Sequence, residues 1–133
     1  MDLLIRAAAL AASALPAALP SPTTAETPEQ VFDCGVVTVC TGSGECRDAG
    51  GAVSLSLHPI DIAPDGSGKL EMRYDGIRAT ARTFSDLGPW VWSETGNDRQ
   101  ILMPSGRDAL VWHHLTIGVT PRSETHFLSC EVG

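Results

Sequence analysis

Four cysteines constrain the fold of this 133-residue chain more than any other feature. They stand at Cys34, Cys40, Cys46 and Cys130, so five residues separate the first two neighbouring pairs and 83 separate the last. Structural zinc sites usually draw their thiolates from close C-x2-C pairs, which this spacing lacks. An even set of cysteines in an exported chain therefore predicts two disulfide bonds.

Strand geometry limits how these cysteines pair. The stretch "QVFDCGVVTVC" is rich in β-branched residues and predicts an extended strand. Cys34 and Cys40 would then lie about 20 Å apart, whereas bridged Cα atoms lie within about 7 Å. Two pairings remain, and we favour Cys40 with Cys46 and Cys34 with Cys130 over the one that links Cys40 to Cys130. The favoured pairing closes a short loop and ties the first strand to the last.

The amino terminus has the order of a secretory signal. One base, Arg6, precedes an apolar run at 7–20, and small residues follow up to Ala25. This pattern predicts a signal peptide over residues 1–25, with a site near Ala18 as the alternative cleavage point. The mature protein would then be periplasmic or secreted. No other apolar run reaches the ~20 residues of a spanning helix, so no membrane span is predicted.

The mature chain, residues 26–133, is expected to be a single β domain of 133 − 25 = 108 residues. The full chain carries nine Lys plus Arg and sixteen Asp plus Glu. The leader removes one charge of each sign, so the net charge stays at 8 − 15 = −7. An acidic surface without a basic run argues against nucleic acid and anionic lipid as partners. Cationic proteins and neutral small molecules remain possible.

Alternation of apolar and polar residues predicts an all-β fold. It is clear at 53–58, where Pro59 is expected to bend or end the strand. It is clearest at 69–82, where Asp75-Gly76 makes a hairpin turn. Seven or eight short strands, separated by turn residues and with no helical stretch, predict a small antiparallel meander barrel or sandwich tied by disulfides. The glycine-rich stretch 41–51 is expected to be a loop.

The stretch "APDGSGKLEMRY" begins like an EF-hand calcium loop. Position one of such a loop would be Ala63 and position twelve Tyr74, so two ligands are missing, including the bidentate carboxylate. Strand patterns flank it where an EF-hand has helices. We therefore predict a turn that leads into a strand.

Four histidines raise the question of a metal or catalytic site. His113 and His114 should face opposite sides of a strand, and His113 shares the parity of Val111 and Leu115, which would point it inward. A site built from His113 and His126 is conceivable if the last two strands pair. The sequence contains no G-x-S-x-G elbow, no phosphate-binding loop and no distinctive carboxylate pair. It therefore favours a non-catalytic protein, with no catalytic residue, cofactor or metal ligand predicted.

Three tryptophans are the candidate binding residues. Trp90 and Trp92 share one face of a short strand, and Trp112 lies on another. Clustered near a barrel mouth, these rings would stack on a sugar or an apolar ligand, or anchor a protein partner. The alternative is that they fill the core.

These features favour a secreted or periplasmic binding protein of unknown ligand. The chain resembles, in architecture, the small periplasmic lysozyme inhibitors of the MliC type, which are exported, disulfide-tied and barrel-like. That family's Ser-Gly motif is matched by Ser105-Gly106, but Arg107, Asp108 and Ala109 follow where the family has a tyrosine. The resemblance implies an inhibitor of an envelope hydrolase as one alternative function, with no inhibitory residue carried over. A small envelope hydrolase with a site not visible in sequence is the other.

Overall fold

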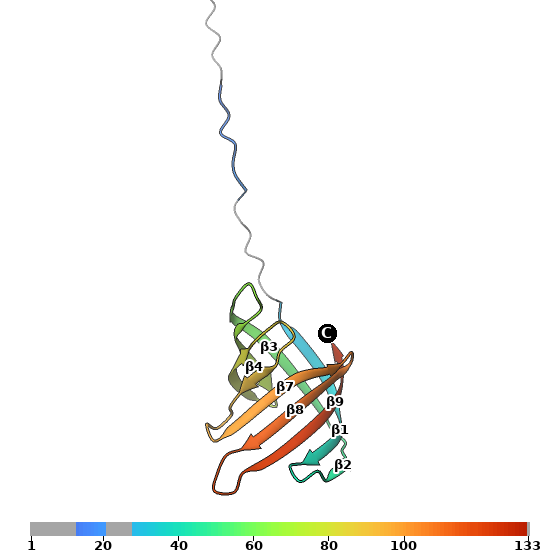
Figure 1. Ribbon diagram of the computed structural model, residues 1–133. Helices are drawn as coiled ribbons and strands as arrows, with labels where there is room; N and C mark the ends of the chain where they lie inside the picture. Colours follow the sequence, from blue (N-terminus) through green and yellow to red (C-terminus); the bar gives the residue numbers. More distant parts are fainter. Residues whose placement is uncertain (1–12, 21–27, 133) are drawn as a thin grey trace, which may run out of the picture.

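The structure is a computed structural model that describes residues 13–20 and 28–132. Most of the predicted signal peptide therefore lies outside the described residues. Within them the regular secondary structure is entirely β, which confirms the predicted fold class (Figure 1). The strands are β1 (Gln30–Thr41), β2 (Cys46–Asp48), β3 (Ala52–Ile62), β4 (Gly68–Tyr74), β5 (Ile77–Thr83), β6 (Trp90–Trp92), β7 (Asp98–Gly106), β8 (Ala109–Thr116) and β9 (Arg122–Val132).

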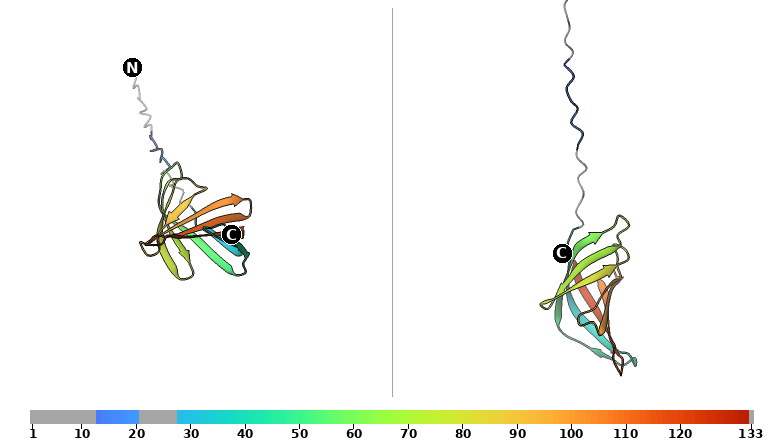
Figure 2. Two further views of the ribbon diagram at one scale, coloured as in Figure 1. Left: turned by 60° about the horizontal axis from the view of Figure 1, so that its bottom comes forward. Right: turned by 90° about the vertical axis from the view of Figure 1, so that its left-hand side faces the viewer.

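The strands form one closed antiparallel barrel. Each of β3 to β8 pairs with the next strand in the chain, and β9 returns to pair with β1. The two further views show the same curled sheet from other sides (Figure 2). Eight strands close the barrel, and the ninth, β2, is an extra strand that pairs with the end of β1. Closure leaves few exposed strand edges. Of the two predicted architectures, the barrel is therefore the correct one and the sandwich is not.

Both predicted disulfides are present. Cys34–Cys130 joins directly opposed residues of β1 and β9, with Cα atoms 4.0 Å apart. Cys40–Cys46 likewise joins opposed residues of β1 and β2. The stretch 41–51 is therefore not a simple loop as expected, because the second bridge holds 46–48 against β1 as a strand.

The inward face of each strand supplies the core. The predicted hairpin forms β4 and β5, with Leu70, Met72 and Tyr74 buried inside. Its turn has positive φ at Asp75 and Gly76, as a two-residue hairpin loop requires. The largest fully buried side chains are Leu55, Met72 and Leu102. Side chains thus fill the middle of the barrel, as they do in other small barrels.

The calcium-like stretch is the turn between β3 and β4, as predicted. Ala63 N–H donates to the Ser67 carbonyl, and Asp65 Oδ1 accepts hydrogen bonds from Ser67 rather than facing an ion site. Pro59 does not end β3, which continues to Ile62. The β3–β4 ladder instead shifts register just after Pro59, and such a bulge accommodates a residue that has no amide hydrogen to donate.

Gly68, the first residue of β4, is a position where alanine is expected to be costly. Its φ is +149°, and a Cβ there would overlap the backbone carbonyl of Asp61. We expect Gly68→Ala to lower the free energy of unfolding by about 2–3 kcal/mol, measured by urea denaturation. Gly76→Ala is the control, because its φ is also positive but a Cβ there meets nothing within 4 Å. The control should cost about 1 kcal/mol, and equal losses would contradict the predicted overlap.

Candidate functional site: the polar mouth of the barrel

The interior of the barrel changes from apolar to polar toward one end. The change is visible in the inward-facing pairs of β8 and β9, read along the barrel. These pairs are Leu110 with Leu128, Trp112 with His126, His114 with Glu124, and Thr116 with Arg122. Because side chains on a strand alternate between faces, all eight lie on the same side of the sheet.

The neighbouring strands continue these polar layers. On β7, the buried Asp98 and Gln100 lie opposite Thr116 and His114 in the register. On β1, Thr41 lies opposite Glu124. The mouth is where β7 and β9 begin and where β8 and β1 end, so closure of the sheet gathers polar residues from distant parts of the chain.

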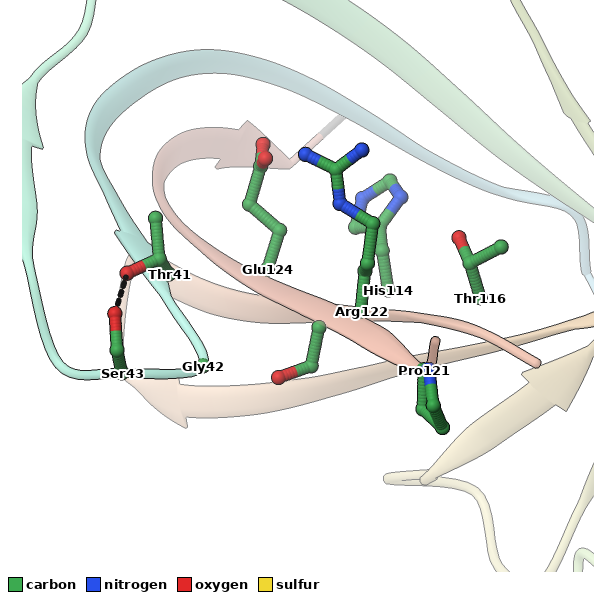
Figure 3. Close-up of a pocket in the computed structure, with 9 residues that line it drawn as sticks. Thr41, Gly42, Ser43, His114, Thr116, Pro121, Arg122 and Glu124 are labelled. Atoms are coloured by element: carbon green, nitrogen blue, oxygen red, sulfur yellow. Dashed lines mark hydrogen bonds between the residues drawn. The ribbon is translucent and has the colours of Figure 1, made fainter. Parts of the chain in front are cut away.

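A cavity of about 790 Å³ occupies this mouth. Figure 3 shows His114, Arg122 and Glu124 projecting the same way from β8 and β9. The loop after β1 closes another side, where the hydroxyls of Thr41 and Ser43 lie 2.9 Å apart. The remaining lining residues are Gly42, Thr116, Pro121 and Ser123. The lining therefore combines one cation, one carboxylate, an imidazole and several hydroxyls.

Three stacked rings form the wall between this cavity and the core. The ring centroids of Trp112 and His114 are 4.4 Å apart, and those of His114 and His126 are 4.5 Å apart. His126 Nε2 lies 2.7 Å from Glu124 Oε1. His114 Nε2 is buried and has no hydrogen-bond partner among the described residues. A buried polar atom of this kind is rare in folded proteins and needs an explanation.

Burial also fixes the charge of His114. It lowers the pKa of this imidazole to about 4, and the neighbouring His126 lowers it as well. A charged imidazole is disfavoured where water is excluded. His114 is therefore neutral near pH 7, and its ring can form a hydrogen bond without adding charge to the mouth.

A buried hydrogen-bond chain holds Trp112 in place. Trp112 Nε1 donates to Gln100 Oε1 at 2.9 Å, and Gln100 Nε2 donates to Asp98 Oδ2 at 3.0 Å. Asp98 also accepts from the backbone N–H groups of Glu94 and Thr95. Burial alone raises the pKa of Asp98, but these hydrogen bonds outweigh it and hold that pKa far below its usual range. A buried carboxylate with its lone pairs occupied is a rigid support for the ring stack.

Tyr74 and Trp92 extend this support. Trp92 Nε1 donates to the Tyr74 hydroxyl at 3.0 Å, and the hydroxyl donates to Glu94. Tyr74 packs edge-on against Trp112, with ring centroids 4.9 Å apart. Burial, followed by the bond to Glu94, raises the pKa of Tyr74. The polar atoms of both buried indoles are thus satisfied, as expected for Trp in a core.

The three tryptophans predicted as binding residues all lie inside the barrel, each with 5% or less of its surface exposed. Trp92 and Trp112 come together beneath the polar mouth, with ring centroids 5.9 Å apart. Trp90 packs instead against Phe32 and lines a separate cavity of about 400 Å³. The tryptophans therefore lie in the core, which was the alternative to a binding role. Any contact between them and a ligand stays a prediction.

The histidine hypothesis is corrected in one respect. His113 faces outward, where its Nδ1 lies 3.0 Å from Thr125 Oγ1, while His126 faces inward, so the two cannot share an ion. The inward residue is His114, because Trp112 rather than Val111 points into the core. Its ring stacks on that of His126 with an angle of 27° between the ring planes, which keeps their nitrogens from converging on one metal. In the described ranges, no three His, Cys, Asp or Glu residues are grouped to hold a metal.

One serine–histidine–carboxylate group lies on the outer face of the barrel. His58 Nε2 is 3.1 Å from Ser56 Oγ and 3.3 Å from Glu29 Oε1. A catalytic triad needs the nucleophile and the carboxylate on opposite ring nitrogens, whereas here both meet the same one. The arrangement is therefore a surface hydrogen-bond cluster and supplies no activated nucleophile.

Neither a scan against protein-family models nor searches of curated proteins and of solved structures found a match for this chain. Among the described residues, no helix has the length and apolar character needed to cross a membrane. The class that the fold and site define is a closed, disulfide-tied β-barrel with a filled core and a polar mouth. The resemblance to lysozyme inhibitors stays a prediction.

Proposed function

We propose that this chain is a non-catalytic binding protein of the periplasm or the secreted space, and that its ligand is a small polar molecule held in the mouth of the barrel. The observation that carries the proposal is His114 Nε2, a buried ring nitrogen without a partner among the described residues, in a side chain that lines a 790 Å³ cavity. A ligand that reaches this nitrogen through a small shift of the side chains covering it would remove the cost of leaving it unsatisfied.

The strands that carry the lining side chains are held in place before a ligand binds. Its volume lies within the ~300–1,000 Å³ typical of small-molecule sites. His114, Thr116, Arg122 and Glu124 stand on strands of a closed sheet, and the chain from Asp98 to Trp112 fixes the ring stack. A site held rigid in advance loses little conformational entropy on binding.

The proposed compartment rests on the disulfides and the charge. Two disulfides fit an oxidising environment, and a net charge of −7 favours neither nucleic acid nor anionic membranes. The alternative functions, an envelope hydrolase or an inhibitor of one, gain no support from a specific contact in the described residues. A binding role therefore remains the function that the geometry supports best.

His114→Phe tests the proposal. Phenylalanine keeps a flat ring between Trp112 and His126 but removes the ring nitrogens. We expect native mass spectrometry of the protein, isolated without denaturation from the cells that produce it, to show a bound small molecule. Its occupancy should fall at least tenfold in His114→Phe, because a lost buried hydrogen bond costs about 1.4 kcal/mol.

His113→Phe is the matched control, since this neighbouring histidine faces the outside of the barrel. It should keep the bound molecule at the level of the unmodified protein. A bound species that survives His114→Phe, or no bound species in the unmodified protein, would contradict the proposed site.

A further inference from the structure

We infer that the mouth selects a small zwitterion, such as a free amino acid, whose carboxylate meets Arg122 and whose ammonium group meets Glu124. This inference rests on the proposed function and names the chemical class of its ligand. It follows from the charges that line the cavity and from what surrounds each of them.

The two charges lie on one face of β9. Arg122 and Glu124 are two residues apart, so both side chains point into the mouth, and their Cα atoms are about 6.6 Å apart. Figure 3 shows both side chains rising from the strand in the same direction. A molecule whose own charges are separated by a few bonds can bridge such a span.

Neither charge is neutralised by the other. No ion pair within 4 Å joins Arg122 to a carboxylate in the part of the chain that the structure describes. Glu124 contacts His126 through Oε1 alone, and its side chain is 43% exposed. Arg122 can therefore accept a carboxylate in two parallel hydrogen bonds, while Glu124 Oε2 can accept from an ammonium group.

The other lining groups do not change this balance. His114 is neutral near pH 7 because burial lowers the pKa of its ring. Thr41, Ser43 and Thr116 offer hydroxyl groups, which donate or accept but carry no charge. The mouth thus presents one positive and one negative group with no net charge.

Ligands of other classes fit this pattern less well. A simple anion would be repelled by Glu124 and by the net charge of −7, and a simple cation would be repelled by Arg122. A sugar is usually held by stacking on an open aromatic face. Here both faces of His114 are covered, by Trp112 and by His126, and Trp112 itself is buried. A zwitterion uses both charges at once.

Binding of amino acids to the purified, oxidised protein tests the inference. Each of the twenty common L-amino acids is titrated by calorimetry at neutral pH. The tightest binder is then compared with its amide, which lacks the carboxylate, and with its N-acetyl derivative, which lacks the ammonium group. We expect each derivative to bind at least tenfold more weakly than the free amino acid.

Two variants assign each charge to its residue. Arg122→Gln should lower the affinity for the free amino acid about as much as amidation of the ligand does. In this variant, amidation should then lower the affinity little further. Glu124→Gln should do the same for the N-acetyl derivative. Arg82→Gln on β5 and Glu131→Gln on β9 remove exposed charges away from the mouth and should bind like the unmodified protein.

The outcomes separate this inference from the proposed function. The inference that the ligand is a zwitterion would be overturned if no amino acid binds at about 10 mM. It would also be overturned if Arg122→Gln and Glu124→Gln both bind as the unmodified protein does. If the molecule found by native mass spectrometry still depends on His114 in that case, the mouth remains a binding site for another class of ligand. If that molecule is also absent, both proposals fail.

Discussion

Replacing both Cys34 and Cys130 by alanine is expected to lower the free energy of unfolding by about 4.7 kcal/mol. The bridge spans 96 residues, so it removes a large part of the conformational freedom of the unfolded chain. Both cysteines are also buried, and their loss leaves unfilled volume inside the barrel. A typical domain is stable by about 5–15 kcal/mol, so the variant should be close to unfolding. Urea denaturation followed by tryptophan fluorescence would measure the change.

The matched control is the second bridge. It spans only six residues, so alanine at both Cys40 and Cys46 should cost about 2.4 kcal/mol in the same model of loop entropy. The bridge also lies at the extra strand β2 rather than at the seam that closes the barrel. Equal losses for the two double variants would show that closure of the long loop is not the main source of stability.

Asp98→Ala is expected to cost about 3 kcal/mol or more. The carboxylate accepts hydrogen bonds from the backbone N–H groups of Glu94 and Thr95 and from the side chains of Ser93, Thr95 and Gln100. Alanine would leave these donors without their acceptor, and those of the buried Gln100 cannot simply turn to water. Trp112 would lose the support of Gln100 as well. Urea denaturation measures the loss, and near-ultraviolet circular dichroism reports the packing of the tryptophans.

Asp98 should also make stability depend on pH. The folded-state pKa of this carboxyl lies well below its ordinary value of 3.8, so near that value the folded protein binds fewer protons than the unfolded chain. Its contribution is complete above pH of about 4–5 and is lost as the pH falls through the folded-state pKa. The side chain introduced by Asp98→Asn cannot titrate, so the fall in stability at acid pH should be smaller in this variant. The urea midpoint between about pH 2 and pH 5 measures this fall. If stability falls with acid pH in this variant as it does in the unmodified protein, Asp98 is not the source of that dependence.

Protonation of His114 is also expected to lower stability as the pH falls, but over a different pH interval from that of Asp98. Its pKa falls from 6.5 to about 4 on folding, so stability is lost as the pH drops through that interval. His114→Phe removes this contribution, while Asp98→Asn keeps it and lowers the folded-state pKa of His114 slightly further, because the nearby carboxylate charge is gone. The two variants therefore separate the two parts of the pH dependence.

The disulfide-tied barrel could be predicted because each of its main signals is local or follows from simple geometry. The hairpin of β4 and β5 follows from strict alternation around Asp75-Gly76, a turn with few alternatives. An extended strand holds Cys34 and Cys40 too far apart to bond, which left two possible disulfide pairings, and the structure contains the favoured one. Where a local signal was weaker, the prediction was less complete. The glycine-rich stretch after β1 contained no strand pattern, and β2 forms there because Cys46 is bonded to Cys40.

The candidate site could not be predicted in the same way, because both faces of β8 are apolar enough to enter a core. Val111 and Leu115 favour one face, and Leu110 and Trp112 favour the other. Parity alone therefore could not decide between them, and the face predicted to point inward, that of His113, is the outer one. A bulge in β1 between Val36 and Thr38 changes the parity of that strand, which brings Val39 and Thr41 to the inner face. Such a shift has no sequence signal here.

The sequence by itself determined the all-β class, the hairpin and the reduction of the disulfides to two possible pairings, because alternation, turn residues and the reach of an extended chain are properties of short segments. Only the tertiary structure decided that Thr41, Asp98, His114, Arg122 and Glu124 share one end of a closed sheet. Their meeting depends on the register in which β9 returns to β1, and that register is set by the packing of the whole core together with the Cys34–Cys130 bond.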